Sequence, residues 1–188
     1  AMIARCPLPE VAAEVLEDRI ALERITGVPV RGMSYPNGSC SDEIVKLLPG
    51  CGIRYSRITG NSDAFALPEV PYRWKATCHH NHNLQELGDQ FLALFKKQYL
   101  YLMYVWGHSY EFDDRDNWDL IETFCRKMGG REDIWYCTNI EFMDCMDAFA
   151  RLQFFADNSF VHNPSAAECW IAVNDEPLCV PGGETVRL

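Results

Sequence analysis

The residue best suited to chemistry in this chain of 188 residues is His108, which follows a continuously apolar stretch at residues 100–106. A short apolar run of this kind is typical of a strand buried on both faces of a sheet. The carboxyl ends of parallel strands face the active site in α/β proteins, and an imidazole there can act as a general acid or base. A hydrogen bond to a backbone carbonyl explains His108 equally well. The nearby Glu111 could orient the imidazole ring, but we favour a solvated or structural role.

A second candidate is the segment RGMSYPNG, which follows another predicted strand and contains Arg31, Tyr35, Pro36 and Gly38. The Arg31 guanidinium can pair with a carboxylate, and loop amides near Tyr35 can donate hydrogen bonds to a developing oxyanion. The residue types alone favour the other interpretation, an ordinary turn between a strand and a helix.

A third candidate is the segment RWKATCHHNHN, in which His79, His80 and His82 suggest a metal site. Adjacent histidines in a loop rarely meet at one ion without a carboxylate or a distant ligand. We therefore favour a surface or pocket-rim loop, and we expect no bound metal in this chain. Trp74, in the same segment, either walls a sugar-sized pocket or packs in the core.

The composition excludes several classes of partner. Apolar residues make up 48% and charged residues 23%, as in a soluble globular protein, and the formal net charge is −10. A nucleic-acid or anionic-membrane surface needs clustered basic residues, so neither partner is expected. The longest apolar run, residues 99–106, is far shorter than the roughly 20 residues that span a bilayer.

Nine cysteines occur at irregular spacings without a CxxC pair. This pattern disfavours a disulfide framework and indicates buried free thiols in a reducing compartment, so we predict a cytoplasmic location.

Periodicity and turn signals predict the secondary structure. The expected helices cover residues 9–26, 42–48, 84–98, 118–128 and 141–152, and the expected strands cover residues 28–31, 53–58, 100–106 and 134–138. Residues 59–83 are predicted to form a long loop, and Ser41 is predicted to cap the second helix. The alternation indicates parallel strands with crossover helices. Short strands from Gln153 onward indicate a small antiparallel appendage, which divides the chain into residues 1–152 and 153–188.

Three segments resemble the polysaccharide deacetylase family, carbohydrate esterase family four. In chain order they are RGMSYPNG, RWKATCHHNHN and the apolar stretch that leads to His108. The similarity begins near residue 16 and extends through the C-terminal segment. The resemblance implies an α/β fold: a partial (β/α) barrel of mostly parallel strands that lacks its first strands, with a C-terminal antiparallel β appendage packed on it. It also implies metal-dependent removal of acetyl groups from N-acetylated sugars, and hence a carbohydrate partner.

The resemblance also implies roles for single residues. His108 would be the general acid that protonates the leaving amine, and Arg31 would steady a catalytic carboxylate. The Tyr35 backbone amide would help to hold the oxyanion. Pro36, Gly38 and Trp74 would contact the substrate.

The chain departs from the family pattern in one respect. The family's paired aspartates and spaced histidines supply the base and the ligands of a divalent metal such as zinc, but no Asp-Asp pair precedes Asp113 and no histidine precedes His79. The resemblance therefore implies an N-terminally truncated member. Amide hydrolysis needs an activated water, and a lone general acid contributes only about 10²–10⁴-fold. We expect this chain alone to be nearly inactive.

Two further expectations follow from the missing strands. The uncovered sheet edge predicts a homo-oligomer, because an open edge exposes unpaired backbone groups and apolar side chains. The alternative to a hydrolase is a non-catalytic homologue that keeps a sugar-binding groove or serves as a scaffold.

Overall fold

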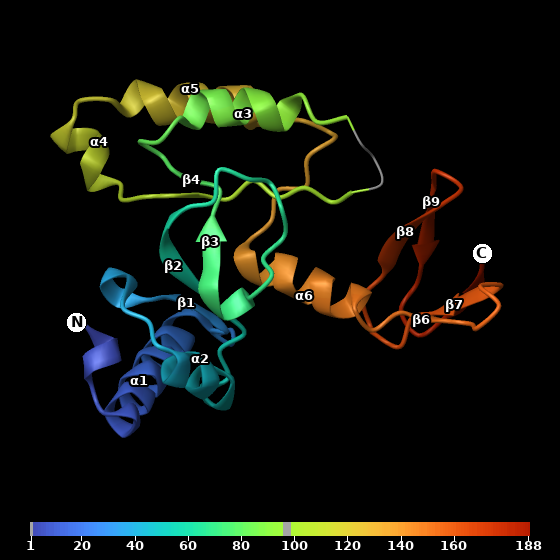
Figure 1. Ribbon diagram of the computed structural model, residues 1–188, viewed down its shortest axis with the longest axis horizontal. Helices are drawn as coiled ribbons and strands as arrows, with labels where there is room; N and C mark the ends of the chain where they lie inside the picture. Colours follow the sequence, from blue (N-terminus) through green and yellow to red (C-terminus); the bar gives the residue numbers. More distant parts are fainter. Residues whose placement is uncertain (1, 96–98) are drawn as a thin grey trace. The chain divides into compact units, whose positions relative to one another are not determined.

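The structure is a computed structural model that describes residues 2–95 and 99–188, and Figure 1 shows the course of the chain. The residues group into two compact units. The first unit runs to Phe95 and continues from Leu100 to Trp135, and the second unit takes Tyr136–Leu188. Within the described residues, no helix combines the length and apolar character needed to cross a membrane.

The helices of the first unit are α1 (Leu8–Thr26), α2 (Asp42–Leu47), α3 (Leu84–Leu92), α4 (Tyr110–Asp114) and α5 (Trp118–Met128), with 3₁₀ turns at Ile3–Arg5, Pro36–Gly38, Leu48–Cys51 and Pro71–Arg73. Three of the first unit's five helices lie close to the predicted ranges, one is shorter than predicted, and α4 was not predicted. The predicted cap is confirmed, because the Ser41 hydroxyl accepts a hydrogen bond from the Ile44 N–H at 3.3 Å. The helix predicted over residues 84–98 ends at Leu92, and residues 96–98 lie outside the described residues.

Parallel strands lie at the centre of the first unit. β1 (Gly32–Ser34), β2 (Tyr55–Asn61) and β3 (Trp74–Ala76) form one sheet with β2 in the middle. After Thr77 the chain continues as β4 (Cys78–His79), which pairs in parallel with β5 (Val105–Trp106) and sets His79 opposite Trp106. The predicted loop at residues 59–83 therefore contains two strands, and the second of them leads into the histidines.

The predicted partial (β/α) barrel is wrong. The described strands are short and fall into separate small sheets, several of them antiparallel, and residues 134–138 form no strand. The apolar stretch at residues 100–106 is not buried on both faces, and only β5 pairs within it. The hydroxyl of Thr77 accepts the Tyr104 N–H at 3.1 Å, so a side chain takes the place of a backbone partner there.

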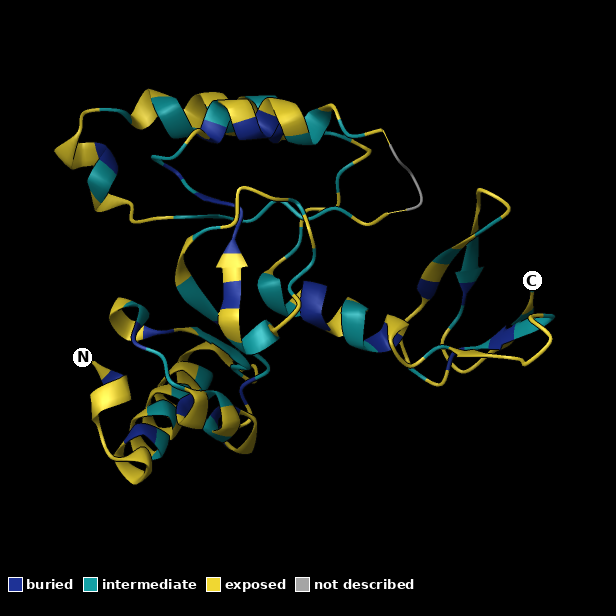
Figure 2. Ribbon diagram, viewed as in Figure 1, coloured by how far each residue is buried: buried dark blue, intermediate teal, exposed yellow. Residues whose placement is uncertain are grey.

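Two apolar clusters support the first unit, and Figure 2 shows their buried residues. In one cluster α1 and α2 pack beside the first sheet, with Ile44 and Leu48 almost completely buried. In the other, α3 packs against α5 through Leu84 and Leu87 and covers Cys78 of β4. The second cluster holds in place the strand that leads into the histidines.

The second unit combines one helix with antiparallel strands. Its elements are α6 (Asn139–Phe149), β6 (Gln153–Phe154), β7 (Phe160–His162), β8 (Cys169–Val173), β9 (Glu176–Val180) and β10 (Thr185–Arg187). α6 begins with a capping box formed by Thr138 and Glu141. The β8–β9 hairpin turns at Asn174 and Asp175, which both have positive φ, as a type I′ turn requires.

The cysteines are free thiols, as predicted, and all nine lie in the described part of the chain. Of these nine, Cys51, Cys78 and Cys169 are buried, whereas the others are partly or fully exposed. Burial raises the pKa of the Cys78 thiol to about 11, which makes it unreactive at neutral pH.

Leu48 provides a test of the first cluster, because its side chain is 0% exposed. Replacing it in Leu48→Ala should lower the free energy of unfolding by about 2–5 kcal/mol, since the change removes buried methyl groups and leaves a cavity. Urea unfolding measures the loss. The control Leu16→Ala, at a 42% exposed position on α1, should change stability by no more than about 0.5 kcal/mol. Equal losses in the two variants would contradict the packing described.

Candidate functional site

A tight turn at the end of β4 brings two adjacent histidines to the same side of the chain. Successive side chains on a strand point to opposite faces, but the strand ends at His79 and the His82 N–H donates to the His79 carbonyl at 2.8 Å. The His80 N–H donates to the Trp106 carbonyl at 2.9 Å, which ties the turn to β5. The centroids of the His79 and His80 rings consequently lie 4.3 Å apart.

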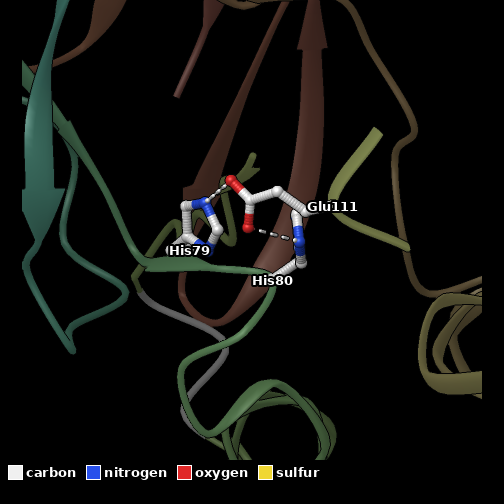
Figure 3. Close-up of side chains that lie close together, drawn as sticks. All are labelled: His79, His80 and Glu111. Atoms are coloured by element: carbon white, nitrogen blue, oxygen red, sulfur yellow. Dashed lines mark ion pairs between the residues drawn. The ribbon is translucent and has the colours of Figure 1, made fainter. Parts of the chain in front are cut away.

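The carboxylate of Glu111 lies between these rings, as Figure 3 shows. It comes from α4, directly after β5, so the parallel pairing of β4 and β5 brings the three residues together. Nε2 of His79 lies 3.4 Å from one carboxylate oxygen, and Nε2 of His80 lies 3.4 Å from the other. The three potential ligand atoms lie within 4.8 Å of one another.

Hydrogen bonds hold the carboxylate and the turn in place. The Asn81 side-chain amide donates to Glu111 at 2.6 Å and lies 2.9 Å from Nε2 of His80. The backbone N–H of His79 donates to the Asn61 side chain at 2.7 Å. Arg115 lies 4.0 Å from Glu111, and its exposed guanidinium adds a distant positive charge.

Aromatic side chains and one glycine shape the surroundings of the rings. Trp106 meets His79 edge-on at 4.6 Å, and Phe112 lies against His80 at 4.3 Å. A side-chain carbon at Gly107 would come within 1.8 Å of Nδ1 of His80. The ring of His80 therefore occupies the space that any other residue at position 107 would need.

Burial controls the charge of the two histidines. The side chain of His80 is 4% exposed, that of His79 is 18% exposed and that of Glu111 is 16% exposed. Burial lowers the pKa of both imidazoles because the charged form loses hydration, and Glu111 opposes this shift only in part. The lowered pKa values favour the neutral form of both rings.

His108 lies beside this cluster without joining it. The residue directly follows Gly107 at the end of β5, as predicted, and its ring centroid lies 6.5 Å from that of His79. Its ring is exposed and stacks on Tyr110 at 5.3 Å. His82 lies outside the cluster, because its Nε2 pairs with Asp63 at 2.9 Å.

The residues of the segment RGMSYPNG take structural positions. The Tyr35 N–H donates to the Arg57 carbonyl at 3.1 Å, so the amide that the resemblance offers to an oxyanion is part of the sheet. The buried Tyr35 hydroxyl donates to the Tyr72 carbonyl at 2.8 Å, and burial raises the pKa of this phenol. Arg31 directly precedes β1 and stands at the opposite end of this strand from Tyr35.

The predicted substrate contacts in the two segments also belong to the scaffold. Pro36 and Gly38 form a 3₁₀ turn, and a side-chain carbon at Gly38 would come within 2.6 Å of the Thr59 hydroxyl. Trp74 is 2% exposed and packs edge-on between the rings of Tyr55 and Tyr104. Trp74 therefore packs in the core and does not wall a groove.

The contact of Glu111 with the two histidines was not predicted, and His80, predicted to lie on a surface or pocket-rim loop, is buried and lines a depression. Asn81 and Glu111 lie 30 residues apart, and their contact depends on the β4–β5 pairing. One available signal was the position of Glu111 a few residues after a predicted strand, at the same edge of the sheet as residues that follow another strand.

An open depression of about 440 Å³ adjoins the cluster. Its lining is rich in side-chain amides and consists of His80, Asn81, Asn83, Leu84, Gln85, Glu86, Asn117 and Leu120. Asn83 and Glu86 are exposed in this lining, whereas the side-chain oxygens of Gln85 and Asn117 are buried.

Comparisons of the chain with models of known protein families, with curated proteins and with solved structures found no match.

The lowered pKa values of His79 and His80 predict a pH-dependent stability. Unfolded histidines, with a pKa near 6.5, bind protons more readily than these buried rings. The free energy of unfolding should therefore fall as the pH drops from about 7.5 to about 5.5. Urea unfolding in the presence of a chelator measures this slope. His80→Gln should reduce the slope, because it removes one of the two buried rings. An unchanged slope in His80→Gln would refute the assignment.

Proposed function

We propose that the protein is a hydrolase that removes acetyl groups from N-acetylated sugars. The observation that best supports this proposal is the cluster of His79, His80 and Glu111 at the carboxyl ends of two parallel strands, with His108 beside it. The carboxylate and the imidazoles are the kinds of group that general acid–base catalysis uses. The motif resemblance points to the same reaction class.

The reaction divides into steps that suit these residues. A water molecule attacks the acetamide carbonyl, the C–N bond breaks, acetate forms and the sugar amine leaves with a proton. His108 is exposed beside the cluster and is the group that gives this proton to the amine. The cluster of His79, His80 and Glu111 lies in place to activate the attacking water.

The amide-lined depression supports a carbohydrate ligand. Asn83 is exposed in this depression and offers a neutral donor and acceptor for sugar hydroxyls and for an acetamido group. The same observation favours a second candidate function, a sugar-binding protein without catalysis. The homo-oligomer and the cytoplasmic location stay predictions.

Acetate release from N-acetylglucosamine oligomers tests the proposal. We expect slow release by the unmodified chain at high protein concentration, and a loss of roughly a hundredfold in His108→Gln, the usual contribution of a general acid. The control His162→Gln, in the second unit, should release acetate at the unmodified rate.

Binding of the same oligomers, followed by isothermal titration calorimetry, separates the two candidates. Binding without any acetate release would refute the hydrolase and support the sugar-binding protein. The absence of both release and binding would refute both functions. Release that is unchanged in His108→Gln would refute the role given to this histidine.

A further inference from the structure

We propose that His79, His80 and Glu111 form the binding site of one divalent transition-metal ion of the zinc class. This inference goes beyond the proposed function and does not depend on it. It also reverses the expectation from the sequence that the chain holds no metal, because the structure supplies the carboxylate that the adjacent histidines lack in the sequence.

The distances fit coordination better than direct hydrogen bonding. Both imidazole nitrogens lie 3.4 Å from a Glu111 oxygen, beyond the 2.7–3.2 Å typical of an N–H···O bond. Two ligands that each lie about 2.0–2.1 Å from a tetrahedral ion are about 3.3 Å apart. The two contacts run to different oxygens of the carboxylate, and one ligand atom from each of the three residues lies within 4.8 Å of the others, close enough to surround a single ion.

The donor set selects the kind of ion. Two neutral imidazoles and one carboxylate suit zinc, cobalt or iron(II), whereas magnesium and calcium prefer oxygen ligands alone. The burial of His80 disfavours strongly hydrated ions, because binding there removes water from the ion. Three protein ligands leave a fourth position open, which is typical of catalytic and not of structural sites.

Most of the surrounding contacts hold the ligands in position before any ion binds, whereas the contact of the Asn81 backbone N–H with His79 must change. Gly107 leaves room for the His80 ring, and the Asn61 side chain fixes the backbone of His79. The Asn81 amide donates to Glu111 at 2.6 Å and orients the carboxylate, as supporting hydrogen bonds do in metal sites. The site thus has both ligands and a supporting shell.

An ion bound at Nε2 of His79 would change the hydrogen bond between His79 and the Asn81 backbone, and this change can be measured. The backbone N–H of Asn81 donates to Nδ1 of His79 at 3.2 Å, so neutral His79 carries its proton on Nε2, which lies near Glu111. An ion bound to Nε2 requires that proton on Nδ1, and the proton moves there by way of solvent. The Nδ1–H of His79 and the backbone N–H of Asn81 would then face each other as two donors, so the Asn81 backbone N–H must leave this contact.

Titration of Co²⁺ into the untagged, metal-free chain tests the site. We expect one equivalent to bind with the intense visible absorption of four-coordinate cobalt, without the charge-transfer band of a thiolate ligand. Zn²⁺ should displace the cobalt. The affinity should fall at least about a hundredfold in Glu111→Gln and in His80→Ala, since loss of a ligand costs no less than loss of a supporting contact.

His82→Gln is the matched control, because it removes a histidine of the same turn that pairs with Asp63 instead. It should bind cobalt like the unmodified chain. In parallel, the backbone amide resonance of Asn81 should shift on addition of Zn²⁺, a readout that is independent of the substitutions.

Three results would overturn the proposal: no stoichiometric binding, unchanged affinity in Glu111→Gln, or a thiolate charge-transfer band. Failure of the metal site is distinguishable from failure of the hydrolase. An ion bound without acetate release would refute only the proposed function, and acetate release without a bound ion would refute only the metal site.

Discussion

The contact of one carboxylate with two neutral imidazoles is the constraint on which the chemistry of the first unit depends. Glu111 and His80 are largely withdrawn from water, and burying an ionised carboxylate is costly unless polar partners replace the lost hydration. Asn81 supplies one short hydrogen bond, but the two imidazole contacts are long. A bound cation would offset the remaining cost, because it would neutralise the carboxylate and accept both nitrogen lone pairs.

The scaffold that holds this contact is built from short elements. β4 and β5 contribute two residues each, so the pairing of His79 with Trp106 relies on neighbouring support. The Thr77 hydroxyl and the Asn61 side chain supply hydrogen bonds that a longer ladder would draw from the backbone. The packing of α3 on α5 covers Cys78 and keeps the short strand in register. Side chains therefore supply hydrogen bonds that the backbones of longer strands supply in larger sheets.

The predictability of each element follows from its length and its local signals. α5 was predicted with its exact bounds, because an amphipathic helix repeats its pattern over several turns. β3 and β4 are too short for an alternating pattern to appear, so their segment was predicted to be a loop. The apolar residues 100–106 were predicted to form a long strand, but composition does not reveal whether a stretch pairs along its length.

Local sequence patterns predicted the position of His108 but not the contacts that assemble the cluster of His79, His80 and Glu111. His108 was placed correctly at the end of a strand, because a short apolar run followed by a glycine marks that end locally. The meeting of Glu111 with His80 depends on the pairing of two strands that are distant in the sequence, and no local pattern encodes it. Trp74 shows the same limit, since only the packing of Tyr55 and Tyr104 around it decides between core and groove.

Anomalous diffraction at the zinc edge, from crystals grown with one equivalent of Zn²⁺, tests the proposed metal site most directly. We expect one strong peak, about 2.0–2.2 Å from Nε2 of His79, from Nε2 of His80 and from a Glu111 oxygen. Peaks at cysteine sulfurs alone, or no ordered peak near these three side chains, would contradict the proposed site.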